Sequence, residues 1–118
     1  MTEAIRRLGT GPRMSKVVLH AGLVYLAGQT SSGTPIPDIA GQTREVLGRI
    51  DELLAEAGSD KSRLLTVTIY LRDIADFAAM NVEWEAWLAG IPAPARATVE
   101  ARLAGPDLLV EMSVIAAA

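Results

Sequence analysis

The sequence contains no cysteine and only one histidine, His20, among its 118 residues. Without cysteine the protein has no disulfide bond, no thiol nucleophile and no thiolate metal ligand. A single histidine also argues against a histidine-based zinc site, which needs several such ligands. His20 lies beside a predicted turn with no carboxylate near it in the sequence, which favours a structural role over a catalytic one. We therefore expect no metal site built on cysteine or histidine.

The sequence also has no excess of basic over acidic residues. The chain carries 11 lysines and arginines against 14 aspartates and glutamates, a formal net charge of -3. Proteins that bind the phosphates of nucleic acids usually present a basic surface, so nucleic acid is not an expected partner. No apolar run approaches the roughly 18 residues of a membrane-spanning helix, and the N-terminal residues lack the apolar segment of a signal peptide. The expected location is the cytoplasm.

Half of the residues are hydrophobic, which is typical of a folded globular protein. A chain of this length is expected to form one domain, residues 1–118. Small domains leave much of their surface exposed. So high an apolar content in so small a chain indicates that part of the surface contacts another subunit.

Hydrophobic periodicity divides the chain into short strands and two helices. The predicted strands are 16–19, 23–27, 64–71, 96–103 and 108–114, and the predicted helices are 38–57 and 73–88. The order β-β-α-β-α-β-β predicts an α+β fold in which two helices cover one face of a single sheet. The other face is expected to carry small polar side chains, including Thr98 and Ser113, and to meet a neighbouring subunit.

The last two strands are predicted to form a hairpin around residues 104–107, where glycine and proline stop both strands. Alternation then places Arg96 and Glu111 on one polar face. In this register Arg96 is opposite Ile115, and the two charged residues are about 13 Å apart along the strands, too far for an ion pair. Three interpretations stay open. The face is an ordinary solvated surface, a bulge shifts this register, or the two residues address opposite ends of a small ligand, which is the preferred functional interpretation.

Two other segments carry polar groups that a ligand can use. The loop 28–37 lacks the glycine spacing of a phosphate-binding loop, so it is either a surface connection or a strand end that presents backbone N–H groups. Asn81 lies on the apolar stripe of the second predicted helix, between Phe77 and Trp84. A buried amide without a partner costs roughly 1–3 kcal/mol, so Asn81 needs a hydrogen bond to nearby backbone or to a functional group.

Six segments resemble the reactive intermediate deaminase family (RidA/YjgF) in order and spacing. They are residues 94–100 (PARATVE), 110–112 (VEM), 115–116 (IA), 26–29 (LAGQ), 41–42 (GQ) and 76–81 (DFAAMN). The resemblance extends over about residues 11–116. It implies the chorismate mutase-like fold of that family and a barrel-like homotrimer with a pocket at each subunit interface.

The same resemblance implies hydrolytic deamination of enamine and imine acids, such as 2-aminoacrylate and 2-iminopropanoate, to 2-oxo acids and ammonia. This reaction requires no metal or organic cofactor. Arg96 is implied to bind the substrate carboxylate, for which a planar guanidinium is well suited. Glu111 is implied to position the attacking water and to take its proton. The remaining implied pocket residues are Arg13, Gly28, Asn81 and Thr98.

The sequence departs from the best-known family members at three positions. Arg13, Ala27 and Thr98 stand where those members have a tyrosine, a serine and a cysteine. A backbone group at Thr98 can serve in place of the cysteine. Loss of the aromatic ring and of the hydroxyl changes the expected substrate range, and Arg13 would favour a more acidic substrate.

A second hypothesis is that a protein with this fold binds ligands without catalysing a reaction, as a metabolite sensor or as a protein-binding, holdase-type module. Release of ammonia from an imino acid distinguishes the two hypotheses. A ribonuclease, an activity attached to some relatives, fits poorly. An acidic chain with one histidine offers neither attraction for phosphates nor an evident acid–base pair.

Overall fold

Six strands form a single mixed sheet in the order β1-β2-β3-β6-β4-β5. The computed structural model describes residues 4–118. The strands are β1 (Arg6–Leu8), β2 (Val17–His20), β3 (Leu23–Gln29), β4 (Leu64–Leu71), β5 (Ala95–Glu100) and β6 (Val110–Ala117). The helices are α1 (Ile39–Glu56) and α2 (Phe77–Trp87), with short 3-10 turns η1 (Lys61–Arg63) and η2 (Ile74–Asp76). The predicted α+β class is confirmed, and β1 is an additional strand that weak periodicity did not reveal.

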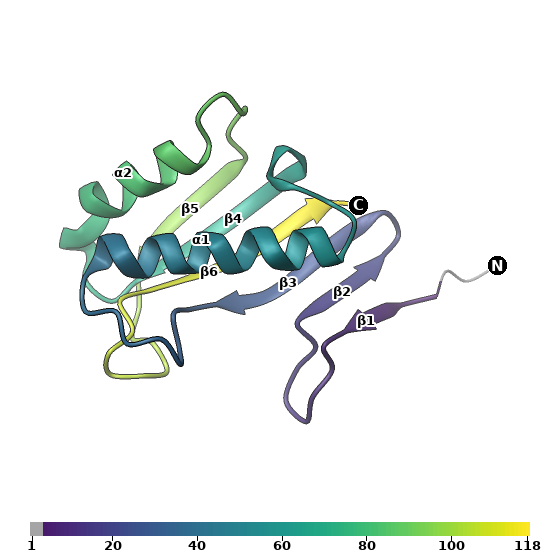
Figure 1. Ribbon diagram of the computed structural model, residues 1–118, viewed down its shortest axis with the longest axis horizontal. Helices are drawn as coiled ribbons and strands as arrows, with labels where there is room; N and C mark the ends of the chain where they lie inside the picture. The colour runs from purple at the N-terminus through teal and green to yellow at the C-terminus, as the bar shows by residue number, and fades with distance from the viewer. Residues whose placement is uncertain (1–3) are drawn as a thin grey trace.

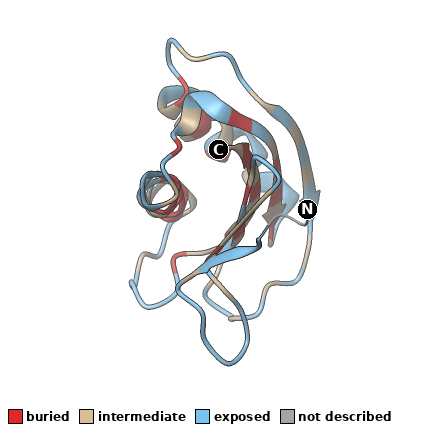
Figure 2. Ribbon diagram, turned by 90° about the vertical axis from the view of Figure 1, so that its right-hand side faces the viewer, coloured by how far each residue is buried: buried red, intermediate tan, exposed pale blue. Residues whose placement is uncertain are grey.

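Both helices pack against the same face of the sheet (Figure 1). Buried residues gather where the helices meet the sheet, while the outer side of the sheet is largely exposed or half-buried (Figure 2). The opposite face has no helix on it, and we call it the open face; its side chains include Tyr25, Thr68, Tyr70, Val99, Glu111 and Ser113. None of the helices within residues 4–118 has the length and apolar character needed to span a membrane.

The ends of α1 follow from local chemistry. The side chain of Asp38 accepts a hydrogen bond from the N–H of Gly41 and caps the first turn. Gly58 has a φ of 77°, the left-handed conformation that commonly ends a helix. On the solvent side Arg49 pairs with Glu45 at 3.1 Å, four residues earlier. The helix predicted over residues 38–57 is confirmed.

The predicted C-terminal hairpin is wrong. β5 pairs with β4 in parallel, and β6 pairs with β4 antiparallel, so β4 separates the two strands. The chain passes from β4 through α2 to β5 as a β-α-β crossover, which is how parallel strands are joined. Residues 101–109 then lead from the edge of the sheet back to β6, and form a long connection instead of a four-residue turn. Alternation within β5 and within β6 is as predicted, but their pairing is not.

Two details differ from what simple periodicity indicates. Strict alternation in the strand 64–71 would bury Leu65 with Val67, but a register shift between Leu64 and Thr66 buries Leu64 and turns Leu65 outward, where it is 46% exposed. In the predicted helix 73–88, Ile74 lies in η2 and Phe77 begins α2; both are exposed, whereas Met80 is fully buried. The first difference arises because a β-bulge shifts the alternation by one residue.

Candidate functional site

Arg96 projects from β5 toward α2, on the helix-covered side of the sheet. It pairs in register with Val67, a core residue of β4, which fixes its face. Its Nη1 donates a 2.7 Å hydrogen bond to Oδ1 of Asn81. The guanidinium carbon lies 5.6 Å from the ring centre of Phe77 and 5.4 Å from that of Trp84. Two aromatic rings and one amide therefore hold the guanidinium in place.

No carboxylate neutralises Arg96 within the described residues. The ion pairs there join Arg44 to Glu83 and Arg49 to Glu45. Thr98 lies two residues along the same face of β5, and its buried hydroxyl oxygen has no hydrogen-bond partner. Partial burial of a charge and of an unpaired hydroxyl costs free energy unless an anion or a second chain supplies the missing hydrogen-bond partners. Arg96, Asn81 and Thr98 form what we call the arginine half-site.

Glu111 lies on the open face, against the backbone of Gly28. Its partner on β4 is Tyr70, and its neighbours Val110 and Met112 are both buried in the core, so its own side chain points the other way. A Cβ placed on Gly28 would lie 2.3 Å from Oε2 of Glu111. Only glycine therefore leaves room for this carboxylate at the end of β3. Gly28 and Glu111 form what we call the glutamate half-site.

The two half-sites lie on opposite faces of the sheet, and the predicted shared polar face is wrong. The β4 partners of Arg96 and Glu111 are Val67 and Tyr70, which are three residues, or about 10 Å, apart along the strand. Thr98 also lies on the helix-covered side and not on the open face where it was predicted. Because the sheet lies between them, a ligand bound at one half-site cannot contact the other half-site of the same chain.

The remaining predicted residues lie around the N-terminal strands. Arg13 is exposed in the β1–β2 connection, beside a hollow of about 430 Å³. The N–H of Ala27 donates to Lys16 at the end of this connection, and Ala27 directly precedes Gly28. Arg13 therefore belongs to the end of the sheet that carries the glutamate half-site. His20 lies at the other end of β2, beside the predicted turn, with a buried Nδ1 that has no hydrogen-bond partner.

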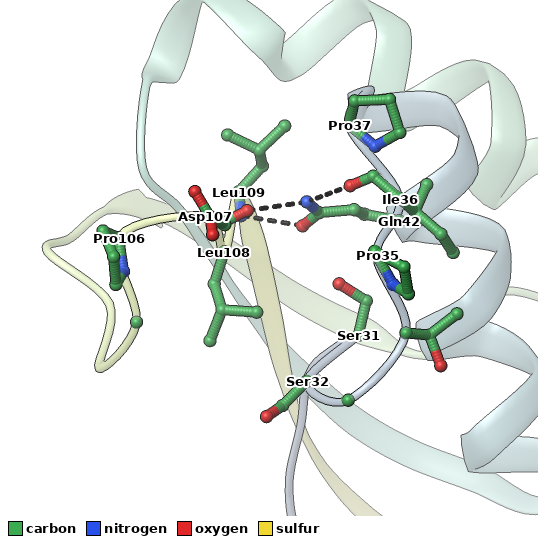
Figure 3. A pocket seen from close by; sticks show the side chains of 13 residues that line it. Ser31, Ser32, Pro35, Ile36, Pro37, Gln42, Pro106, Asp107, Leu108 and Leu109 are labelled. Atoms are coloured by element: carbon green, nitrogen blue, oxygen red, sulfur yellow. Dashed lines mark hydrogen bonds between the residues drawn. The ribbon is translucent and has the colours of Figure 1, made fainter.

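Gln42 is a functional candidate that the sequence analysis missed. Its Nε2 donates to the carbonyl oxygens of Ile36 and Asp107, and its Oε1 accepts from the N–H of Leu109, each at 2.8 Å (Figure 3). The side chain is 1% exposed. Gln42 thus joins the loop that follows β3 to the loop that precedes β6, along a cavity of about 800 Å³ between them. The sequence did contain a signal for Gln42. It lies three residues after Ile39, on the apolar stripe of the helix, where a polar side chain needs a buried hydrogen-bond partner.

Arg72 holds the same C-terminal loop from the side of β4. Its Nε donates to the carbonyl of Leu108 at 2.6 Å, and its Nη2 donates to the carbonyl of Gly105. The backbone N–H of Arg72 also donates to the carbonyl of Leu109. One amide and one guanidinium therefore fix the loop that leads into β6.

Replacing Gln42 with leucine is expected to lower the free energy of unfolding by about 2–4 kcal/mol, because three buried backbone groups lose a partner. Urea denaturation measures this change. Gln29→Leu is the matched control, since Gln29 makes one local bond, to the carbonyl of Ala27, and should cost less than about 1.5 kcal/mol. Equal costs for the two variants would contradict the assigned role of Gln42.

Neither half-site resembles a metal centre. Within residues 4–118, no group of three histidine, aspartate or glutamate side chains lies close enough to hold a metal ion. Hydrogen bonds from Ser62 lower the pKa of Asp60, which caps η1 and belongs to neither half-site. The chemistry available is that of a guanidinium, a carboxylate, an amide and a hydroxyl.

Comparisons with known proteins identify the family and support the fold. The family model described as Endoribonuclease L-PSP matches residues 5–118. A RutC family protein of Haemophilus influenzae is 46% identical over 112 residues, which cover 95% of this chain and 97% of that protein. The RutC family protein YoaB of Escherichia coli is 41% identical over 96% of this chain and 97% of its own length. A crystal structure of a YjgF family member from Neisseria meningitidis has a TM-score of 0.91 and 47% identity, covering 97% of this chain and 94% of that one.

Proposed function

The chain belongs to the RidA/YjgF family, and on this basis we propose that it hydrolyses reactive enamine and imine acids to 2-oxo acids and ammonia. The substrates are of the 2-aminoacrylate and 2-iminopropanoate type. The observation that carries the proposal is the half-buried guanidinium of Arg96, which has a neutral amide for a partner and no carboxylate within the described residues.

Arg96 binds the carboxylate of the substrate. Its contacts with Asn81, Phe77 and Trp84 hold the guanidinium in one orientation before the ligand arrives. A preorganised guanidinium can grip a carboxylate with two parallel charge-assisted hydrogen bonds. The unpaired hydroxyl of Thr98 supplies a further hydrogen bond on the same face.

Glu111 activates the water. An enamine first takes a proton at C3 and loses one from nitrogen, which gives the imine. Glu111 then takes a proton from the water as its oxygen bonds to the carbon of the C=N group, while the nitrogen takes a proton from solvent. In the resulting carbinolamine, Glu111 passes its proton to the nitrogen and the hydroxyl releases its proton to solvent. The C–N bond breaks as the C–O bond becomes a C=O bond, which leaves ammonia and a 2-oxo acid. No electron leaves the system, and the reaction consumes only water. Positioning and proton transfer supply the acceleration.

The two half-sites act together across a subunit interface. Because they lie on opposite faces of one chain, Arg96 of one subunit and Glu111 of its neighbour complete each pocket. The open face offers exposed Tyr25 and Val99 for such a contact. A heterologous contact of this kind, repeated by a three-fold rotation, closes into a homotrimer with three pockets.

Arg13 favours an acidic substrate. Between Ala4 and Pro37 the sequence has four basic residues and no acidic one, although the whole chain is acidic. This part of the molecule therefore attracts anions, and Arg13 lies in its exposed loop.

The direct test is ammonia release from an imino acid generated in situ by an amino acid oxidase. The purified protein is expected to raise the hydrolysis rate well above the buffer rate, in proportion to its concentration. If the rate stays at the buffer value while the 2-oxo acid still binds, the protein is a metabolite sensor and the enzymatic proposal fails.

Gly28→Ala is expected to lower kcat by about tenfold or more with little loss of stability. The added methyl group occupies the place of the Glu111 carboxylate, which is the flexible end of a side chain and can move away. Displacing a catalytic group by about 1 Å can cost up to about a hundredfold in rate. Gly48→Ala is the control, because a Cβ at Gly48 in α1 meets nothing within 4 Å; it should keep full activity. An unchanged kcat in Gly28→Ala would separate Glu111 from catalysis.

A further inference from the structure

We propose that Gln42 is a positioning residue for Glu111, acting through the two loops that it joins. The inference rests on the proposed role of Glu111 in activating water. It concerns a side chain that touches no substrate and that belongs to a different element from either half-site.

The pairing of β3 with β6 is irregular at the glutamate half-site. These strands pair from Leu23↔Ala117 to Leu26↔Val114, and after a register shift their last pair is Gln29↔Met112. Glu111 precedes Met112, so it lies beyond the last residue paired with β3, although it still pairs with Tyr70 of β4. The close approach of Gly28 and the Glu111 carboxylate therefore occurs at the irregular end of this pairing.

Gln42 spans this irregular end. Its bond to the carbonyl of Ile36 holds the chain that continues from β3, and its bonds to Asp107 and Leu109 hold the chain that enters β6. Leu109 is two residues before Glu111. The amide nitrogen donates both of its hydrogens to carbonyl oxygens from two different loops, and the amide oxygen accepts a hydrogen bond from a backbone N–H. The amide is buried, so these three bonds are sheltered from water.

Loss of the amide is expected to let Glu111 move relative to Gly28. Arg72 still fixes the loop on the side of β4, so β6 stays paired with β4. The loop after β3 loses its tie to the loop that precedes β6, while Arg49 still donates to Ser32 and Thr34 within it. The expected defect is a displaced carboxylate in a protein that still folds, which lowers the rate of the chemical step and leaves the arginine half-site unchanged.

The test is a double-mutant cycle on kcat between Gln42→Leu and Glu111→Gln. Gln42→Leu alone should lower kcat by roughly tenfold to a hundredfold with KM within about twofold. In the Glu111→Gln background the same substitution should lower kcat by less than about twofold, because residues that act as a unit are not additive. Equal losses in both backgrounds would overturn the proposal.

A matched control separates positioning from stability. Leu47→Ala, on the same helix, removes a buried side chain and should cost about 2–5 kcal/mol in stability, yet it should leave kcat unchanged below the unfolding temperature. If Leu47→Ala lowers kcat as much as Gln42→Leu, the role of Gln42 is structural only. Should Gln42→Leu fail to fold, Gln42→Asn serves instead. It keeps a buried amide but is one methylene shorter, so it cannot bond to both loops at once, and its kcat should fall likewise.

A readout without turnover distinguishes this inference from the proposed function. The chemical shift of the Glu111 carboxyl carbon can be compared by NMR, at one pH, in wild type, Gln42→Leu and Leu47→Ala. It should change in Gln42→Leu, because the carboxylate no longer lies against Gly28, and stay as wild type in Leu47→Ala. If neither the wild type nor any variant hydrolyses imines but the chemical shift changes as stated, the proposed function fails and the positioning role stands. An unchanged chemical shift overturns the positioning role.

Discussion

Replacing Arg96 with alanine is expected to lower kcat/KM for imine hydrolysis by about a hundredfold or more. The substitution removes the group that we propose binds the substrate carboxylate, and loss of one partner of a sheltered charge pair costs about 2–5 kcal/mol. Steady-state kinetics on an oxidase-generated imine measure the change. A group that binds the carboxylate does so in both the ground state and the transition state, so much of the loss should appear in KM.

Arg102→Ala is the matched control for Arg96→Ala. Arg102 follows the same strand and is exposed, so its removal makes the same change in charge without touching the arginine half-site. It should stay within about twofold of wild type. If Arg96→Ala and Arg102→Ala behave alike, Arg96 does not bind the substrate.

Replacing Glu111 with glutamine is expected to lower kcat by about a hundredfold to ten-thousandfold, the usual contribution of a general base. Glutamine has nearly the same shape and still fits over Gly28, so the fold and the binding of the carboxylate should be retained. The expected pattern is a low kcat with KM little changed, the reverse of that for Arg96→Ala.

Glu100→Gln provides the comparison for Glu111→Gln. Glu100 lies on the helix-covered face of β5 and accepts a hydrogen bond from the N–H of Ile74 at 3.0 Å. Its substitution makes the same change in charge away from both half-sites and should leave kcat within about twofold. A Glu111→Gln protein with wild-type kcat would assign water activation to another group.

The elements of the fold were predictable where one physical signal dominates. The helix over residues 38–57 has a clear apolar stripe and a glycine stop, and α1 ends where both indicate. The strand 64–71 was equally clear, apart from the bulge at Leu65. β1 has three residues, too few for alternation to be recognised.

The pairing of the strands was not predictable from alternation alone. Alternation of polar and apolar residues shows which residues of one strand share a face. The same alternation is expected whether two strands pair as a hairpin or have a third strand between them. Insertion of β4 between β5 and β6 moved Arg96 and Glu111 to opposite faces. The residues of the candidate site were identified from the family resemblance. Their division into two half-sites required the structure.

Two contacts at the candidate site had almost no local signal. Asn81 was expected to find a backbone or functional partner, and its partner is the guanidinium of Arg96, 15 residues away. Gln42 bonds to residues 65 and 67 positions later in the chain. Contacts over such separations depend on the packing of α1 and α2 on the sheet, which sequence periodicity does not describe.

Complementation between inactive variants tests the central claim, that each pocket takes Arg96 from one subunit and Glu111 from another. Arg96→Ala and Glu111→Gln chains, unfolded and refolded together in equal amounts, should form mixed trimers in which roughly a quarter of the pockets receive both intact residues. The account predicts recovery of about a quarter of the wild-type activity from two proteins that are each nearly inactive. Activity of the mixture no higher than the average of the two separate variants would contradict it.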